Sequence, residues 1–292
     1  MIRSPLSAFL SRLNTLVESW LHYGNPIEIL WQRMRQGSLT EFRVVDRLSG
    51  VVCRCRPAAH RMFGEVWFDR DYDVPSLILR PGDVVLDIGG NQGFFACYAA
   101  WRGCRVLTFE PDTDNVRLMK SNLQANHFTN RVKVVQAAVK ATAGEVRLLR
   151  SDRLGGGMHT TVPQFAKRFG FVDGESISVP AVNLADTLKT EEIERVRLCK
   201  IDCEGAELEI VETLTAGEMQ RIDAFAVEFH RDAYSPDLLV AALERSGTHH
   251  VFPSASKNYC HRDILYALSK GIVKEILRTP SCEPPPKFAS AS

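Results

Sequence analysis

The chain has 292 residues, 45% of them hydrophobic and 24% charged, a composition typical of a globular protein that buries a sizeable core. Lys and Arg number 36 and Asp and Glu 35, so a net charge of +1 supplies neither a basic field for nucleic acid nor an acidic solvating tail. We therefore expect no nucleic acid partner. The eight cysteines include no Cys-x-x-Cys pair and no zinc-ribbon spacing, which favours reduced thiols in a cytoplasmic protein.

Residues 1–75 read as an extension that precedes the main domain. Its first part contains no continuous apolar run of signal-peptide or membrane-spanning length. Apolar residues instead recur at helical spacing, in a stripe that we expect to pack on the protein's own body, with peripheral membrane contact as the alternative. The stripe consists of Leu6, Leu10, Leu13, Val17, Trp20 and Leu21. Further on, two alternating runs around a Ser-Gly turn predict a β-hairpin in 41–56, and a short helix is predicted in 73–83.

From Val84 onward the pattern alternates between strands and helices, in a main domain that we place at 76–275. The predicted strands are 84–88, 105–110, 132–139, 145–150, 195–202 and 224–230. The predicted helices are 93–103, 112–127, 207–214 and 236–247, with Asp112 as an N-cap. A Gly-rich segment, 154–160, is expected to be a mobile loop over a pocket, in which His159 is either solvated or in contact with a substrate. We expect 257–263 to belong to a hairpin at the sheet's edge and the Pro/Ser-rich 276–292 to be a disordered tail.

The predicted strands are almost continuously apolar. Such strands, alternating with helices, imply an α/β fold with a parallel sheet covered on both faces. Right-handed crossovers then bring the carboxyl ends of the strands to one edge of the sheet. Because ligands bind at that edge in such folds, chemistry is expected where these strands end.

The first of these strand ends carries a glycine turn, "VVLDIGGNQGFF". The dinucleotide fingerprint G-x-G-x-x-G fails in both possible registers, which disfavours an NAD-dependent oxidoreductase, and the phosphate-loop signature is absent. What remains is D-x-G-x-x-x-G with Asn91 in the middle, a residue that tolerates left-handed backbone. The alternative is a tight crossover from strand to helix that binds no ligand.

Two carboxylates follow neighbouring predicted strands. Asp87 precedes the glycine turn, where it would repel a pyrophosphate but suit a ligand with a positive end, such as an amino acid ammonium group. Glu110 ends the next strand, where an acidic side chain can accept hydrogen bonds from both hydroxyls of a ribose. A nucleoside with a cationic amino acid tail is S-adenosylmethionine, which we therefore expect as the cofactor.

Four segments together resemble the FkbM family of S-adenosylmethionine-dependent methyltransferases. They are "VVLDIGGNQGFF", "VLTFEPDTDNVRLMKSNLQAN", "VKVVQAAVKATAGEVRL" and "RLCKIDCEGAELEIVETL", within about Val84 to Leu214. The resemblance implies a class I, Rossmann-like methyltransferase fold with a seven-stranded sheet whose last strand is antiparallel. It also implies transfer of a methyl group to oxygen, often on sugars or other natural products.

The resemblance also assigns residues to the cofactor. The methionine end would lie against Asp87, Gly89, Gly90, Asn91 and Gly93, the ribose against Glu110, and the adenine beside Ala138. The family usually has Ala where this chain has Gly90, a difference expected to be tolerated. The turn after the third strand, "VKATAGE", lacks the family's usual acidic residue, so backbone carbonyls would bind the adenine amine.

The stretch "KIDCEGAE" supplies candidates for catalysis. Lys200, Asp202 and Glu204 have period two, so one face of an extended segment would present all three. We hypothesise that Asp202 or Glu204 accepts the proton of a hydroxyl or orients it, while Lys200 tunes the charge. The alternative for Lys200 is a structural ion pair with one of the carboxylates.

Glu228 and His230 end the next strand with the same alternation. His230 is a second candidate base, since imidazole titrates near neutral pH, and the alternative is a purely hydrogen-bonding role. Asp202, Glu204, Glu228 and His230 could also hold a divalent cation, although no metal is predicted.

The favoured function is thus an S-adenosylmethionine-dependent O-methyltransferase that acts on a small-molecule or glycan hydroxyl. The alternative is a methyltransferase-like domain that binds a nucleoside ligand or a protein partner without catalysis. Neither the acceptor nor the oligomeric state can be predicted from these residues.

Overall fold

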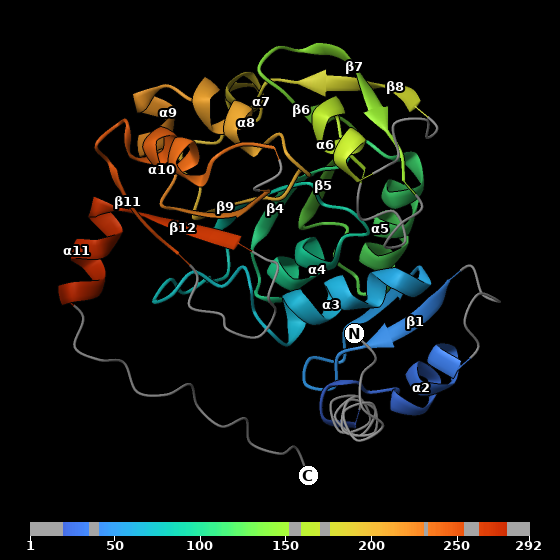
Figure 1. The fold of residues 1–292 in the computed structure, drawn as a ribbon. Coiled ribbons are helices and arrows are strands. Elements are labelled where there is room, and N and C mark those ends of the chain that lie inside the picture. The colour runs from blue at the N-terminus through green and yellow to red at the C-terminus, as the bar shows by residue number, and fades with distance from the viewer. Residues whose placement is uncertain are drawn as a thin grey trace, which may run out of the picture.

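The computed structural model describes residues 20–34, 41–151, 159–169, 176–230, 233–253 and 263–278. Within these residues the strands form sheets of two, seven and three strands. Helices cover both faces of the largest sheet, as Figure 1 shows. The arrangement is the layered α/β fold expected from alternating apolar strands and helices.

The seven-stranded sheet has the order β11-β12-β10-β9-β3-β4-β5. Its strands are β3 (Val84–Ile88), β4 (Arg105–Phe109), β5 (Val132–Val135), β9 (Leu198–Ile201), β10 (Ala224–Phe229), β11 (His249–Pro253) and β12 (Asp263–Ser269). Neighbours from β5 through β10 pair in parallel, and the last strand, β12, pairs antiparallel with both β10 and β11. The predicted class I methyltransferase fold, with its seven-stranded sheet and antiparallel last strand, is confirmed.

Both faces of the sheet are buried, which explains the continuous apolar runs of its strands. Side chains such as Val85 and Val106 pack into one core with α3 (His60–Trp67), α4 (Phe94–Trp101) and α5 (Thr113–Ala125). Their neighbours Leu86 and Leu107 pack into a second core on the opposite face. That second core includes α7 (Leu184–Thr190), α8 (Glu207–Thr213), α9 (Ala216–Gln220) and α10 (Pro236–Glu244). Strand side chains that point to either face of the sheet are therefore buried, instead of those on one face alone.

The predicted strand 132–139 is wrong as a single element. After β5 the chain leaves the large sheet, and β6 (Ala138–Val139) pairs in parallel with β8 (Ser176–Val182), beside β7 (Gly144–Leu149). This three-stranded sheet lies next to α6 (Pro163–Arg168), at the upper right of Figure 1. Sequence reasoning missed β8, α6 and α7. Pro180 in the middle of β8 hides that strand, because proline lacks the N–H that a ladder needs.

The predicted helix in 73–83 is also wrong, because no helix forms there. Pro75 and Pro81 disfavour helical backbone at the residues that precede them, and Ser76 has a φ of 65°. The helical turns lie earlier, in η1 (Pro57–Ala59) and α3. By contrast, the predicted hairpin is confirmed as β1 (Phe42–Val45) paired antiparallel with β2 (Val52–Cys55).

The hairpin is fastened to α5 by two asparagine side chains. Asn126 accepts from the Val52 N–H (2.9 Å) and donates to its carbonyl (2.7 Å). Asn122 accepts from the Arg54 N–H (2.7 Å) and donates to its carbonyl (3.0 Å). The extension therefore shares a hydrophobic core with the sheet, and the predicted boundary at residue 75 stays a prediction.

Several predictions concern residues outside the described ranges. These are most of the N-terminal apolar stripe, the loop 154–158, the segment 257–262 and the tail beyond α11 (Lys270–Arg278). The helix α11 includes 276–278, the first residues of the predicted tail. Trp20 and Leu21, which end the stripe, are exposed, and α2 (Pro26–Met34) follows them. Across the described residues, no helix is both long and apolar enough to cross a bilayer.

Candidate active site

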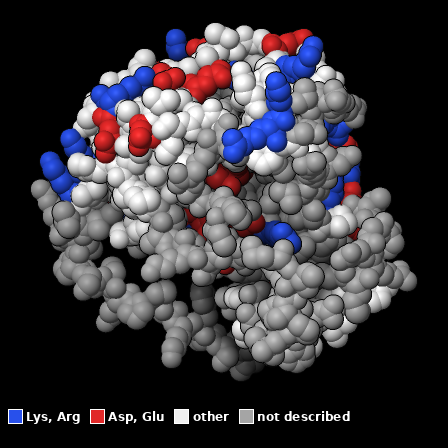
Figure 2. Space-filling view, viewed as in Figure 1, with Lys and Arg blue, Asp and Glu red and all other residues white. Residues whose placement is uncertain are grey.

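A pocket opens at the carboxyl ends of β3, β4, β9 and β10, where the fold predicts a ligand site. It encloses about 1090 Å³ of empty space, including its open mouth. Five of its lining side chains are acidic, and Figure 2 shows acidic atoms inside a hollow on this face of the molecule. They are Glu65, Glu110, Asp202, Glu204 and Glu228.

The glycine turn forms one wall of this pocket through Gly89, Gly90 and Asn91. Gly89 and Asn91 have left-handed backbone, with φ of 77° and 48°, and Gly93 (φ 85°) is the N-cap of α4. A Cβ atom on Gly89 would lie 1.7 Å from the carbonyl oxygen of Asp202. The turn therefore needs glycine because the neighbouring protein backbone is so close, in addition to any close approach by a ligand.

Gly90 is equally constrained by its surroundings. A Cβ at this position would lie 2.2 Å from Thr108 Oγ1 and 2.7 Å from Met119 Cε. Both neighbours are completely buried, so neither has open space to move into. Alanine at position 90 thus requires the core behind the turn to shift.

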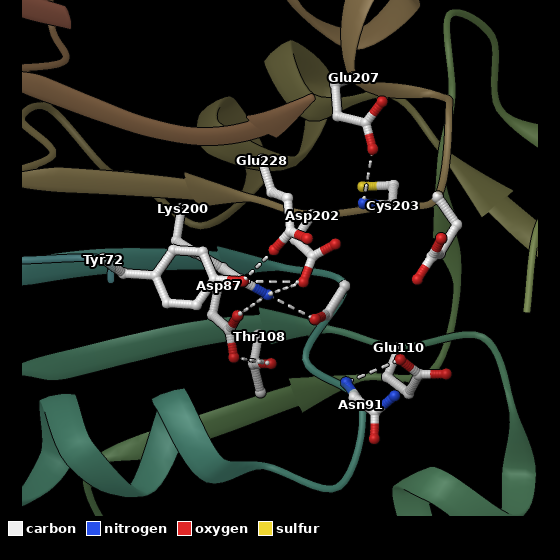
Figure 3. A network of polar contacts seen from close by, with 12 residues as sticks. Tyr72, Asp87, Asn91, Thr108, Glu110, Lys200, Asp202, Cys203, Glu207 and Glu228 are labelled. Carbon is white, nitrogen blue, oxygen red and sulfur yellow. Dashed lines mark hydrogen bonds and ion pairs between the residues drawn. The ribbon is translucent and has the colours of Figure 1, made fainter. Parts of the chain in front are cut away.

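Glu110 lies at the other side of the turn and also lines the pocket. One carboxylate oxygen accepts from the Asn91 N–H (2.8 Å), as Figure 3 shows. The other accepts from the Asp112 N–H (3.0 Å) and from the Asn115 amide (3.3 Å). Burial raises the pKa of Glu110 to about 7, against the opposing effect of these donors. The carboxylate is held in place with lone pairs still able to accept from hydroxyl groups.

Asp87 lies behind the turn and is not part of the pocket wall. Its side chain is completely buried. One oxygen accepts from the Thr108 hydroxyl (2.9 Å), and the other lies 3.3 Å from Lys200 Nζ. The lysine thus occupies the place that the sequence-based reasoning gave to a ligand's ammonium group.

Lys200 lies at the centre of a polar network in which Figure 3 shows the side chains converging. Its ammonium group donates to the Gly89 carbonyl (2.7 Å) and lies 3.7 Å from Asp202 Oδ2. Burial alone would lower the pKa of Lys200, but the carboxylates of Asp87 and Asp202 outweigh it and hold the pKa above its ordinary value. This geometry matches the alternative interpretation of Lys200, a structural ion pair that shapes the turn.

Tyr72 joins the ends of two strands and was missed by sequence reasoning. Its hydroxyl oxygen lies 3.0 Å from Asp202 Oδ2 and 2.8 Å from Glu228 Oε2. A phenol has one proton, so it can donate to only one of these carboxylates at a time. The ring also packs edge-on against Phe95 and lies 5.2 Å from Lys200 Nζ. Tyr72 therefore sets the positions of both carboxylates at the pocket.

Asp202, Glu228 and His230 offer ligand atoms that lie within 4.8 Å of one another, as in a metal site. Tyr72 hydrogen-bonds to the two carboxylates, and Lys200 lies beside Asp202. Both nitrogens of His230 face other carboxylates. A cation would have to displace these partners, so the donor set fits a metal poorly.

Glu204 lines the pocket, but not through the predicted alternation. The strand β9 ends at Ile201, and Glu204 has left-handed backbone with a φ of 54°. The Thr160 hydroxyl donates to its carbonyl (2.7 Å), which holds this turn. Its side chain lies 3.2 Å from His230 Nε2. Burial raises the pKa of Glu204 to about 7, although His230 partly opposes that rise.

Two further sequence-based candidates line the pocket. One is Ala138, on β6, whose role beside an adenine stays a prediction. His159 also lines it, and the expectation of a solvated loop histidine is wrong because its side chain is only 6% exposed. The ring accepts from the Ser151 N–H (3.0 Å), which fixes it against β7.

Comparison with known proteins assigns the family. The family model described as the methyltransferase FkbM domain matches residues 87–251, more than half of the chain. The chain belongs to the FkbM methyltransferase family. It is therefore a methyltransferase, and the resemblance found in the sequence is confirmed.

Several members and one solved structure show the extent of the similarity. The chain is 28% identical to 31-O-demethyl-FK506 methyltransferase FkbM of Streptomyces tacrolimicus, over 59% of this chain and 75% of that protein. It is 24% identical to hexuronic acid methyltransferase AglP of Haloferax volcanii, over 57% and 66%. It is 26% identical to methyltransferase sdnD of Sordaria araneosa, over 65% and 82%. The crystal structure of methyltransferase FkbM from Methylobacillus flagellatus matches with a TM-score of 0.47 and 15% identity, over 70% of this chain and 47% of that one.

Proposed function

We propose that this FkbM-family methyltransferase uses S-adenosylmethionine to methylate a hydroxyl oxygen on a sugar or another hydroxylated natural product. The observation that carries the proposal is the layout of one pocket. A fixed carboxylate suited to a ribose, Glu110, lies at one side, and acidic side chains suited to a hydroxyl acceptor lie at the other. Two relatives support the acceptor class, since one is a 31-O-demethyl-FK506 methyltransferase and the other a hexuronic acid methyltransferase.

The residues that line the pocket fit the cofactor. The turn, through Gly89, Gly90 and Asn91, would hold its methionine end, and Ala138 would lie beside the adenine. Glu110 would accept from the ribose hydroxyls. Gly93, the N-cap of α4, shapes the turn through its left-handed backbone.

The ammonium group of the cofactor needs a carboxylate partner, and Asp87 is not available for a direct contact. Lys200 already neutralises Asp87, whereas Asp202 is partly exposed and its backbone touches the turn. We assign the ammonium group to Asp202, and to Asp87 the indirect role of holding Lys200 against the turn.

When bound, S-adenosylmethionine supplies a methyl group on a sulfonium, and the acceptor oxygen forms the new C–O bond as the C–S electron pair returns to sulfur. The chain must align the hydroxyl with that bond and remove its proton. Asp202, Glu204 and Glu228 line the pocket where this hydroxyl would lie, with Lys200 and His230 beside them.

The experiment is methyl transfer from labelled S-adenosylmethionine into small-molecule and glycan fractions from the cells that produce the protein. We expect the label to enter a neutral fraction as an alkali-stable ether, with loss of transfer in Glu110→Ala. Label in an amine, or in a base-labile ester formed on a carboxylate, would contradict methylation of a hydroxyl. Binding of S-adenosylhomocysteine without any transfer would instead indicate the non-catalytic binding protein.

A further inference from the structure

Three side chains lie in a line that leads from the pocket into the protein. Glu204 lines the pocket, His230 lies behind it, and Glu207 is completely buried behind His230. His230 Nε2 lies 3.2 Å from Glu204 Oε2, and His230 Nδ1 lies 3.1 Å from Glu207 Oε1. One imidazole therefore bridges a carboxylate in the pocket and a carboxylate in the core.

The inner carboxylate is fixed by several donors at once. The N–H groups of Cys203 and Gly205 donate to Glu207 Oε1 at 2.9 and 3.0 Å. The Tyr234 hydroxyl donates to Glu207 Oε2 at 2.9 Å. Burial alone would raise the pKa of Glu207, but His230 and these donors outweigh it and lower the pKa. Glu207 is therefore a rigid anion against which His230 is oriented.

The imidazole carries a proton on each nitrogen. A neutral ring has one N–H, so one nitrogen lone pair would face a carboxylate oxygen, which is repulsive. Glu204 and Glu207 face the ring directly, Asp202 and Glu228 lie close by, and Phe165 packs edge-on against it. Burial lowers the pKa of His230, but Glu204 and Glu207 together raise it well above its ordinary value.

Glu204, the carboxylate that faces the pocket, has fewer partners than the acidic side chains near it. Asp202 Oδ2 already has two partners, because Lys200 Nζ lies 3.7 Å from it and the Tyr72 hydroxyl lies 3.0 Å from it. The Oε1 atom of Glu204 has no hydrogen-bond partner among the described residues, and the side chain is 18% exposed toward the pocket. A pKa of about 7 suits a base that works near neutral pH.

We infer that Glu204 accepts the proton of the acceptor hydroxyl, and that Glu207 is a positioning residue that acts on Glu204 through a charged His230. This inference rests on the proposed function and deepens it. The O–H proton moves to Glu204 Oε1, and the electron pair left on oxygen forms the bond to the methyl carbon. His230 donates to Glu204 Oε2 throughout and keeps both of its protons.

The inference predicts a shift in pH dependence, with a definite sign. Transfer requires ionised Glu204, so the rate rises with pH through the pKa of that group, about 7. In Glu207→Gln the imidazole loses its inner anion and releases a proton between about pH 6 and about pH 8, so Glu204 loses its cationic neighbour as the pH rises. The pKa of Glu204 then increases, and the rising limb moves to higher pH by roughly one to three pH units. A purely structural role for Glu207 would lower the rate without moving the limb.

The test combines the pH profile of methyl transfer with NMR of the protein carrying isotope-labelled histidine and bound S-adenosylhomocysteine. His230→Gln assigns the His230 signal. In the wild type we expect a doubly protonated ring from about pH 6 to about pH 8, and in Glu207→Gln a ring that titrates within that range. Glu209→Gln, on the same helix, removes a surface contact with Lys140 and the Ala141 N–H and should match the wild type in both readouts.

The inference is overturned if His230 is neutral in the wild type, or if Glu207→Gln leaves both the NMR titration and the rising limb unchanged. Should Glu207→Gln fail to fold, His230→Gln must move the limb in the same direction. Binding of S-adenosylhomocysteine is measured on each variant by calorimetry. Loss of that binding in the wild type would contradict the proposed function, whereas normal binding with an unmoved limb would contradict the inference alone.

Discussion

Tyr72 places one phenolic oxygen between two carboxylates at the pocket. A variant that removes only this hydroxyl tests the role of the residue. In Tyr72→Phe, Asp202 and Glu228 lose their shared partner while the ring keeps its contact with Phe95. We expect methyl transfer to fall about 10- to 100-fold, the loss for a hydrogen bond to a charged group. The measurement is the initial rate at saturating cofactor.

The matched control is Tyr98→Phe, which removes a buried tyrosine hydroxyl that contacts Asp73 outside the pocket wall. That variant should keep its transfer rate. An unchanged rate in Tyr72→Phe, or an equal loss in both variants, would contradict the role given to Tyr72.

At the scale of single residues, the sequence identified those that follow strands with regular alternation. Asp202, Glu228 and His230 were found because parallel strands end at one edge of the sheet. Tyr72 was not found, since the segment before β3 has no periodic pattern. Glu207 was read only as part of a helix, because its contact with His230 depends on how α8 packs beside β10.

Asp87 shows a different limit of sequence reasoning. Its position before the turn was identified correctly, but its partner was not. Lys200 was expected either to tune the charge beside Asp202 and Glu204 or to pair with one of those carboxylates, whereas the parallel pairing of β3 with β9 places Asp87 opposite Lys200. Strand register, which the chain order alone does not give, decides which charges meet.

At the scale of elements, the contact between α5 and the hairpin depends on Asn122. Its buried amide hydrogen-bonds to the backbone N–H and carbonyl of Arg54. It also donates to the Gln92 carbonyl in the glycine turn (2.8 Å). In Asn122→Ala these backbone groups lose their partners, and we expect the free energy of unfolding to fall by about 2–4 kcal/mol. Denaturant unfolding measures this.

Gln124→Ala provides the comparison, because Gln124 is exposed on the same helix. It should leave the unfolding free energy within about 0.5 kcal/mol of the wild type. A loss of similar size in both variants would show that the effect is not specific to the bonds between Asn122 and the hairpin.

In the large sheet, β3, β4, β5, β9 and β10 were predicted because their residues form nearly continuous apolar runs between helices, whereas β11 and β12 were not predicted as strands. Asp112 caps α5 by accepting from two backbone N–H groups, as predicted. The three-stranded sheet was predicted poorly. Its strands include the two-residue β6 and the Pro-containing β8, which are too short or too irregular for a period-two pattern to identify.

At the scale of the whole molecule, buried acids make stability depend on pH. Burial raises the pKa of Glu110 from 4.5 to about 7, so the folded state holds a proton that the unfolded state releases. Glu204 behaves likewise, and the raised pKa of His230 adds stability that is lost as pH rises through that pKa. Burial lowers the pKa of His249, so this residue opposes the trend at pH values below the ordinary pKa of histidine. We expect the ligand-free protein to lose stability as pH rises from about 5 to about 8.

Glu110→Gln removes the contribution of Glu110 to the pH dependence of stability, since the amide of glutamine does not ionise. Thermal unfolding across this pH range should give a melting temperature that falls less steeply in Glu110→Gln than in the wild type. Identical slopes, or a wild-type stability that rises with pH, would contradict the assigned pKa of Glu110.

The account as a whole depends on a nucleoside-binding pocket in which Glu110 accepts from a ribose. The most direct measurement is isothermal titration calorimetry of S-adenosylhomocysteine with the folded wild type and Glu110→Ala. We predict binding at one site in the micromolar range for the wild type, and an affinity about 10- to 100-fold weaker for Glu110→Ala. A wild type that gives no binding heat at ligand concentrations of about 1 mM, or a Glu110→Ala variant that binds equally well, would contradict it.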